Sequence, residues 1–325
     1  MNHGSRPRNR GTSDRLKTGR DIFHRSSYMI AKSAPPRRIL LATDLSCRCD
    51  RALDRAVALA EQWTAELVAV AVAETGAADM LDERQRKWRR QADPIERMRW
   101  RLARDIGSGA GNIRLMVEEG DPASSIHAIA ERERCDLIVT GFGHDETLGR
   151  IFLGSTVDRL VRRTQIPVLV VRERMAGGYE RVLATTDASQ DSLEALRVAS
   201  AYFPGAALTL FHAFDFPYSS LLDDRDFSHE AGQKEAELNR LVRNGGFANS
   251  TLQQGVKAIA AFGSPEALLP DYVEDHRIDL TVVGSNGHGA LFDALIGSTH
   301  RKLLDTLEGD ILIVREADTQ PAPVS

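Results

Sequence analysis

The chain contains 325 residues, of which 42% are hydrophobic and 27% are charged, and its formal net charge is −4. The length predicts about two domains, and the composition is typical of a soluble globular protein. No apolar run approaches the roughly 18 residues that a membrane-spanning helix requires, and the mild charge gives no whole-chain reason to expect nucleic-acid or membrane binding.

The first 37 residues differ in composition from the rest of the chain. Residues 1–28 are rich in Arg, Ser, Gly and Asn, and they lack the apolar core of a secretory signal. We expect residues 1–37 to form a disordered tail, and residues 318–325 form a short tail after the last strand. A shortened chain that starts at Met29 is expected to fold and to bind ligand normally.

The strands and helices expected first in the chain belong to a region at residues 38–174. Short apolar runs predict five strands, at residues 39–43, 66–72, 112–118, 136–140 and 167–172. Helical spacing of apolar residues follows the first strand, and residues 80–106 and 155–164 have helical patterns as well. Strands that alternate with helices predict a parallel sheet with helices on both faces.

The cysteines lie within this region and are few. Three are too few for a disulfide framework, which indicates a reducing compartment, and we expect the cytoplasm. No matching ligands lie near the closely spaced pair, so we expect no metal site. The cysteines are Cys47, Cys49 and Cys135.

The segment at residues 84–104 carries nine basic residues against two acidic ones, with Trp88 and Trp100 interleaved. One interpretation is a helix that binds anions or nucleic acid. The other is a solvated helix that begins at Pro94 and packs through Ile95, Met98 and Leu102. The corresponding segment further along the chain is not basic, so we favour the solvated helix and do not expect nucleic acid as a partner.

The region at residues 180–317 repeats the first region. Five separate blocks recur with one offset of 143 residues, which indicates a duplication. We name residues 38–174 copy one and residues 180–317 copy two, with a glycine-containing linker at 175–178. The paired blocks are 38–44 with 181–187, 120–122 with 263–265, 136–141 with 279–284, 154–155 with 297–298, and 168–172 with 311–315.

Copy two has a glycine-rich loop after its fourth strand, in which Gly284, Gly287 and Gly297 are followed by Ser298 and Thr299. Glycines let the backbone approach a phosphate closely, and N–H groups at a helix N-terminus attract anions. The hydroxyls add donors or cap the helix. Neither a Walker-type P-loop nor a dinucleotide fingerprint is present. A plain turn with a helix start remains the alternative.

Asp187 ends the first strand of copy two, as Asp44 does in copy one. Ligands of parallel sheets bind beyond the carboxyl ends of the strands, where the strand order switches. We therefore expect Asp187 and the glycine loop to share one rim, where the carboxylate can accept hydrogen bonds from a nucleotide. A helix N-cap is the alternative role for Asp187.

These residues closely resemble the universal stress protein family, in its tandem form, over nearly the whole chain after residue 37. The resemblance implies two five-stranded parallel sheets of a Rossmann-like, adenine nucleotide alpha hydrolase-like fold, and ATP, with Mg²⁺ as an accompanying ion. It implies that Asp187 contacts adenosine near the ribose and that the main chain at Ala213 and Val283 contacts the base. The implied phosphate contacts are Gly284, Gly287, Gly297, Ser298 and Thr299.

Copy one departs from this pattern because His144 stands where Gly287 stands in copy two. The imidazole either crowds the site or donates to a phosphate. Copy two departs in its fifth strand, where Asp310 replaces Pro167 and is expected to alter packing. The residues that copy one retains for a second site are Asp44, Gly141, Gly154, Ser155 and Thr156.

We expect an ATP-binding regulator of stress resistance that acts through conformation or partner binding. No catalytic residues are assigned, because no Walker-type lysine and no acidic pair for Mg²⁺ are present. The alternatives are a weak ATPase or phosphotransferase and a scaffold that no longer uses nucleotide. In the family, fifth strands of two domains pair as a dimer, so we expect the two copies to pair within the chain, with a homodimer as a further assembly.

Overall fold

The structure is a computed structural model, and it describes residues 34–74, 93–107, 113–142, 144–145, 150–151, 155–189, 191–215, 227–245, 255–284 and 307–315. Copy one contains β1 (Arg38–Thr43), η1 (Cys47–Cys49), α2 (Asp50–Trp63), β2 (Glu66–Ala73), α3 (Pro94–Ile106), β3 (Ile113–Glu119), α4 (Pro122–Arg132), β4 (Leu137–Gly141), β5 (His144–Asp145), β6 (Arg150–Ile151), α5 (Ser155–Arg163) and β7 (Val168–Val171). Copy two contains β8 (Arg181–Thr185), η3 (Asp191–Leu193), α6 (Glu194–Tyr202), β9 (Ala207–Phe214), α7 (Ser228–Asn244), β10 (Lys257–Phe262), α8 (Pro265–His276), β11 (Leu280–Gly284) and β12 (Asp310–Val314).

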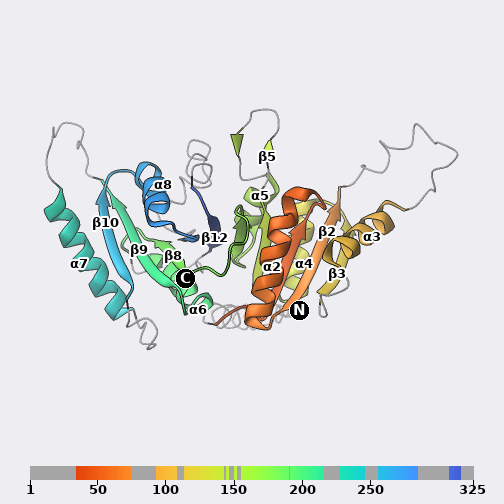
Figure 1. Ribbon diagram of the computed structural model, residues 1–325, viewed down its shortest axis with the longest axis horizontal. Helices are drawn as coiled ribbons and strands as arrows, with labels where there is room; N and C mark the ends of the chain where they lie inside the picture. The colour runs from red at the N-terminus through yellow and green to blue at the C-terminus, as the bar shows by residue number, and fades with distance from the viewer. Residues whose placement is uncertain are drawn as a thin grey trace, which may run out of the picture.

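One continuous sheet runs through both copies, in the strand order β10-β9-β8-β11-β12-β7-β4-β1-β2-β3. The five strands within each copy are parallel, which confirms the predicted fold class. The two five-stranded halves of the sheet meet where β7 of copy one pairs with β12 of copy two, and these two strands are antiparallel. Figure 1 shows copy two at the left, with α7 and β10, and copy one at the right, with α2 and α3.

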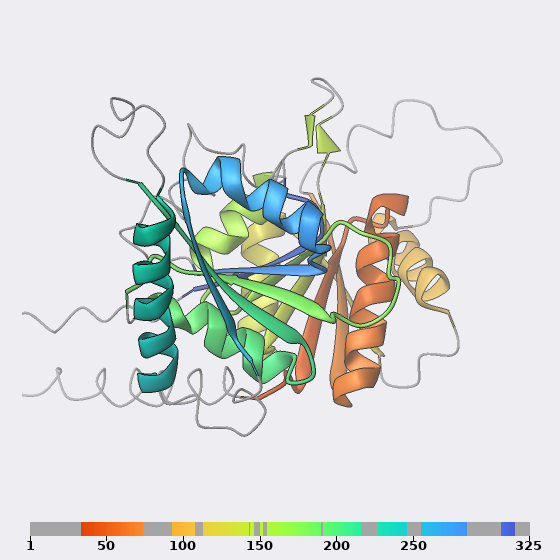
Figure 2. The same cartoon turned by 60° about the vertical axis from the view of Figure 1, so that its left-hand side comes forward.

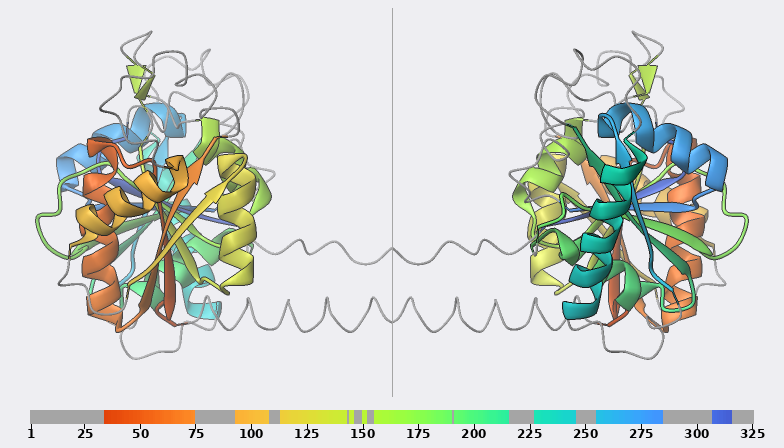
Figure 3. Two further views of the ribbon diagram at one scale, coloured as in Figure 1. Left: turned by 90° about the vertical axis from the view of Figure 1, so that its right-hand side faces the viewer. Right: turned by 90° about the vertical axis from the view of Figure 1, so that its left-hand side faces the viewer.

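Helices cover both faces of the sheet because successive strand residues point to opposite sides. In β1, Ile39 and Leu41 pack with the first core, under α2, α3, α6 and α7. Leu40 and Ala42 pack with the second core, under α4, α5 and α8. Figure 2 shows α7 at the left of the strands of copy two and α8 above them. Figure 3 shows the strands of copy one between α2 and α4. The molecule is therefore a three-layer α/β/α structure.

The observed strands agree with the predicted ranges to within one or two residues. The pair β5–β6 was not predicted: after β4, His144 pairs with Ile151 and Asp145 pairs with Arg150 in an antiparallel hairpin. Several predicted features lie outside the described residues, namely residues 1–33 of the first tail, the second tail at 318–325, the first part of the helical pattern at 80–106 and the helix at 298–306. Residues 34–37, which were assigned to the first tail, are described, and Arg37 N donates a hydrogen bond to Asp136 Oδ2 at 2.8 Å. In the part of the chain that the structure describes, no helix has the length and apolarity needed to cross a membrane.

The basic segment is described only from Asp93 onward. The Asp93 carboxylate caps α3 by accepting a hydrogen bond from Ile95 N at 2.9 Å. Leu102 is buried, whereas Trp100 is 63% exposed and Arg104 lies 5.2 Å from its ring centroid. The described part of the segment therefore has the amphipathic arrangement of a solvated helix.

The repeated blocks 120–122 and 263–265 both have the sequence Gly-x-Pro, and each forms the sharp turn that leads from the third strand into the following helix. Gly120 and Gly263 have φ values of 153° and 136°. The N–H of Gly263 donates to the Phe214 carbonyl at 2.9 Å, so the turn is tied to the neighbouring strand. A side chain at Gly263 would place its Cβ atom 3.2 Å from Leu268 Cδ1. Both the backbone conformation and the space therefore favour glycine.

Replacement of Gly263 with alanine should lower the free energy of unfolding by about 1–3 kcal/mol, because the residue must hold a strained φ. Gly205→Ala is the matched control, since nothing lies within 4 Å of its Cβ position, and its effect should stay within about 0.5 kcal/mol. Urea unfolding followed by circular dichroism measures both. Equal losses in the two variants would contradict the proposed strain.

Candidate functional site

Three adjacent strand ends form the rim of copy two. In β8, Thr185 pairs with Phe211 of β9, and Ala184 pairs with Val282 of β11. Continuing this register by one to three residues places Asp187 at the same rim as Ala213, Val283 and Gly284. The Thr186 N–H donates to the Phe211 carbonyl at 3.0 Å, which extends the contact between β8 and β9 as far as the rim. These four predicted residues are therefore brought together.

A tight turn holds Asp187 at the end of β8. Its Oδ1 accepts a hydrogen bond from Ser189 N at 2.9 Å, and Thr186 Oγ1 accepts one from Ala188 N at 3.0 Å. Ala188 between them has a φ of 66°. The N-cap alternative for Asp187 is wrong, because the N-cap residue of α6 is Leu193.

The Asp187 carboxylate is stabilised as the charged form. Partial burial opposes ionisation, but hydrogen bonds from Ser189 and Ser192 outweigh it, so the pKa of Asp187 lies below its usual value. Asp187 therefore presents a negatively charged acceptor at neutral pH. Such an acceptor suits donor groups such as ribose hydroxyls and excludes direct contact with phosphate oxygens, which it would repel.

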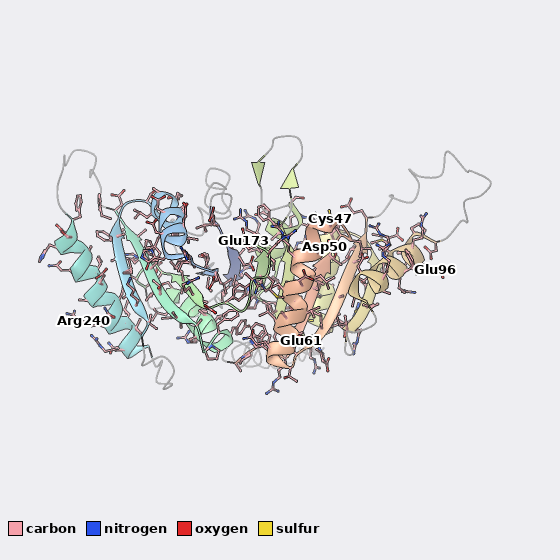
Figure 4. All side chains as sticks on the ribbon, viewed as in Figure 1. Cys47, Asp50, Glu61, Glu96, Glu173 and Arg240 are labelled. Atoms are coloured by element: carbon pink, nitrogen blue, oxygen red, sulfur yellow. The ribbon has the colours of Figure 1, made fainter. Side chains whose placement is uncertain are left out.

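Copy one has the same turn at its own rim, with one different neighbour. Asp44 Oδ1 accepts hydrogen bonds from Ser46 N at 2.8 Å and from the Cys49 thiol at 3.1 Å. Burial opposes ionisation of Asp44 as well, but the bonds from Ser46 and Cys49 hold its pKa below the usual value. Burial raises the pKa of Cys49 to about 11, so its thiol stays protonated. Figure 4 shows Cys47 and Asp50 at the rim end of α2, with Glu61 at the other end.

The rest of the copy-one rim differs more from the rim of copy two. Gly141 ends β4 beside Thr43 when the β1–β4 register is continued, and Ser155 and Thr156 open α5. Between them, the β5–β6 hairpin starts at His144, the position that corresponds to Gly287. Copy one therefore keeps the aspartate and the helix start but has paired backbone where the glycine loop is expected.

Part of the predicted phosphate site lies outside the described residues. These positions are Gly287, Gly297, Ser298 and Thr299 in copy two and Gly154 in copy one. Among the described residues, no group of three His, Cys, Asp or Glu side chains is placed to hold a metal ion.

His212 is a rim residue that sequence analysis missed. It is buried at 8% exposure on β9, one residue before Ala213, and its ring stacks on Phe214 with centroids 6.1 Å apart. Its Nδ1 lies 3.0 Å from the Thr186 carbonyl, which can only accept, so Nδ1 donates. Sequence analysis could not single out His212, because one histidine within the apolar run of β9 has no distinguishing spacing.

Two joined parallel α/β domains, each with an ionised aspartate at the end of its first strand, define a tandem α/β protein with one carboxylate-bearing rim in each copy. The sequence model of the universal stress protein family matches residues 36–172 and 178–315. The chain therefore belongs to the universal stress protein family, as the resemblance implied.

Individual relatives agree with this family. Universal stress protein Rv2005c from Mycobacterium tuberculosis is 30% identical over 188 residues, which are 56% of this chain and only 62% of that protein, less than two thirds of its length. Universal stress protein MJ0531 from Methanocaldococcus jannaschii is 28% identical over 146 residues, which are 42% of this chain and 82% of that protein. The solved structure of PA1789 from Pseudomonas aeruginosa has a TM-score of 0.61 at 21% identity, covering 89% of this chain and 95% of that one, and it supports the fold.

Proposed function

We propose that the protein is an ATP-binding regulator in which copy two holds the nucleotide, with Mg²⁺ as an accompanying ion. The observation that carries this proposal is the shared rim of Asp187, Ala213, Val283 and Gly284, directly before the glycine pattern that continues to Thr299. The Asp187 carboxylate accepts from adenosine near the ribose. The main chain at the ends of β9 and β11 contacts the base, and the glycine loop binds the phosphates.

The regulator is favoured over an enzyme by the chemistry of the rim. Phosphoryl transfer uses metal ligands and a residue that orients the nucleophile. Asp187 is already engaged by Ser189 in the turn, which fits a binding role better than a catalytic one. Bound ATP would then change the protein's conformation or its affinity for a partner. The three free cysteines support a cytoplasmic location.

The decisive experiment identifies the ligand directly. The freshly purified full-length protein is denatured, the released small molecules are identified by mass spectrometry, and ATP binding to nucleotide-free protein is measured by calorimetry. We expect about one ATP for each chain. Absence of both retained and added ATP would contradict the proposal, and steady phosphate release would favour the enzyme.

Asp187→Ala should raise the Kd for ATP by about 10-fold, because one charge-assisted hydrogen bond to the nucleotide is lost. Asp44→Ala is the matched control, since it removes the equivalent turn acceptor from copy one. Calorimetry measures both Kd values, and thermal unfolding checks that both variants fold. A rise caused by Asp44→Ala alone would move the nucleotide to copy one.

We also propose that the pairing of β7 with β12 inside one chain is the state of the protein in solution. Its support is the antiparallel register in which Leu169 faces Leu312, with Val168 and Val170 facing Ile313 and Ile311. This pairing removes two exposed strand edges at once. Homodimers would then form through other surfaces.

A further inference from the structure

A buried carboxylate lies at the junction of the two copies. Asp310 opens β12 and is 0% exposed. Its Oδ1 accepts hydrogen bonds from Arg172 N at 2.8 Å and Glu173 N at 3.0 Å, and its Oδ2 accepts one from Tyr179 Oη at 2.5 Å. Figure 4 labels Glu173 between the two halves of the molecule. Copy one and Tyr179, which directly follows the linker, therefore both supply donors to a carboxylate of copy two.

The cation that faces this carboxylate comes from copy one. Arg55 lies on α2, is only 6% exposed, and its Nε is 3.4 Å from Asp310 Oδ2, close enough for an ion pair but without hydrogen-bond geometry. Its Nη1 donates to the Gly177 carbonyl at 2.7 Å, and its guanidinium lies 4.3 Å from the Tyr179 ring centroid. The cluster thus joins α2, the linker and β12. We name Arg55, Tyr179 and Asp310 the junction cluster.

The two copies do not repeat the junction cluster. At the offset of 143 residues, Arg55 corresponds to Val198 and Asp310 corresponds to Pro167. The buried positions of α2 and α6 correspond at the same offset, since Ala52, Arg55, Ala56 and Leu59 match Ala195, Val198, Ala199 and Tyr202. The cation therefore belongs to copy one alone, and the carboxylate belongs to copy two alone.

Other junction contacts are shared by both copies. Arg172 donates to the Leu307 carbonyl, and the equivalent Arg315 donates to the Arg162 carbonyl at 2.7 Å, two residues before the position that corresponds to Leu307. The β7–β12 register is also symmetric, because Leu169 and Leu312 correspond and pair with each other. These contacts alone would equally allow β12 of one chain to pair with β12 of a second chain.

Pairing between like copies would separate the charges of the junction cluster. With two copies one, Arg55 would meet Pro167 instead of a carboxylate. With two copies two, Asp310 would meet Val198 instead of a cation. Leaving one member of a buried ion pair without its partner is strongly unfavourable. The symmetric backbone contacts permit like pairing, whereas the charges oppose it.

We propose that the junction cluster makes the pairing of fifth strands selective. It favours pairing of copy one with copy two over pairing of two copies one or of two copies two. The cluster therefore acts against pairing of two copies one, or of two copies two, from different chains. The end of copy one and the linker strengthen the selection, because Glu173 N and the Gly177 carbonyl are themselves bonded to the cluster. This inference rests on the proposed pairing within one chain, and it is independent of nucleotide.

Disulfide trapping in the whole chain tests two claims separately, the pairing of β7 with β12 within one chain and the selectivity of that pairing. The starting protein carries Cys47→Ser and Cys49→Ser, which leave the buried Cys135. Residues that face each other on antiparallel strands are close enough for a disulfide. Leu169→Cys with Leu312→Cys should form a disulfide within the chain on mild oxidation, seen as a faster-migrating monomer on a non-reducing gel. Absence of that monomer would overturn the pairing itself.

Leu312→Cys alone tests the selectivity, because like pairing would place Leu312 of two chains opposite each other. With Arg55 and Asp310 present, we expect almost no covalent dimer. With Arg55→Met and Asp310→Leu added, the dimer fraction should rise at least about tenfold, since removing both charges together leaves no unpaired ion. Abundant dimer with the native cluster, or no rise without it, would overturn the selectivity. Arg55→Gln with Asp310→Asn repeats the test with polar side chains if the apolar variant fails to fold.

Discussion

Replacement of Gly287 with histidine should raise the Kd of the protein for ATP by about 100-fold, the loss expected when charge-assisted bonds to phosphates are broken. The change copies His144 of copy one into the glycine loop of copy two. A Cβ atom and an imidazole would occupy a turn where the backbone is proposed to approach the phosphates closely. Calorimetry with nucleotide-free protein measures the Kd, and mass spectrometry measures retained ATP.

The reciprocal change and a distant one serve as controls. His144→Gly should leave the stoichiometry near one nucleotide for each chain, because the paired β5–β6 backbone remains in copy one. Gly178→His places the same side chain in the linker, where nothing lies within 4 Å of the Cβ position. Unchanged binding in Gly287→His would move the nucleotide site away from the glycine loop.

Asp310→Leu alone should lower the free energy of unfolding by about 3–5 kcal/mol, because it leaves the Arg55 guanidinium buried without its carboxylate. Arg55→Met alone should lower the free energy of unfolding by a similar amount, because it leaves the Asp310 carboxylate buried without its cation. The double variant should lose less than the sum of the two single losses, because no charge is left buried alone. The Tyr179 hydroxyl and the N–H groups of Arg172 and Glu173 lose their acceptor in the single Asp310 variant and in the double variant alike. Urea unfolding of the four proteins gives the coupling free energy.

An exposed pair provides the comparison for this cycle. Lys234 and Glu237 form an ion pair at 3.2 Å on α7, with side chains 38% and 52% exposed. Lys234→Met should change the free energy of unfolding by less than about 0.5 kcal/mol. Purely additive losses in the Arg55 and Asp310 variants would show that the two residues do not act as a pair.

The fold was predictable from sequence because each of its determinants is local or repeated. Buried parallel strands give continuous apolar runs such as Val168–Val171, and the matching run Ile311–Val314 at the same offset shows that the unit occurs twice. The Gly-x-Pro turns mark helix starts because Gly263 adopts a positive φ in the turn and Pro265 begins α8. Asp187 could be placed at the rim because parallel strands end on one side of the sheet.

The junction cluster could not be predicted, because its members are far apart in sequence and only the fold brings them together. Asp310 was recognised as unusual at the position of Pro167, but a lone acidic residue does not name its partner. Arg55 lies on a helix rich in charged residues, where a buried arginine has no distinct spacing. The β5–β6 hairpin was missed because its strands are too short to have a pattern of their own.

The one-sided junction cluster also restricts how the gene can change. Duplicated segments tend to be made alike again when one repeat is copied over the other. Here such copying would put Val198 in the place of Arg55, or Pro167 in the place of Asp310, and would leave a charge buried alone. If the cluster has the proposed role, neither copy can replace the other, and sequence change in each copy is constrained to keep Arg55 in copy one and Asp310 in copy two.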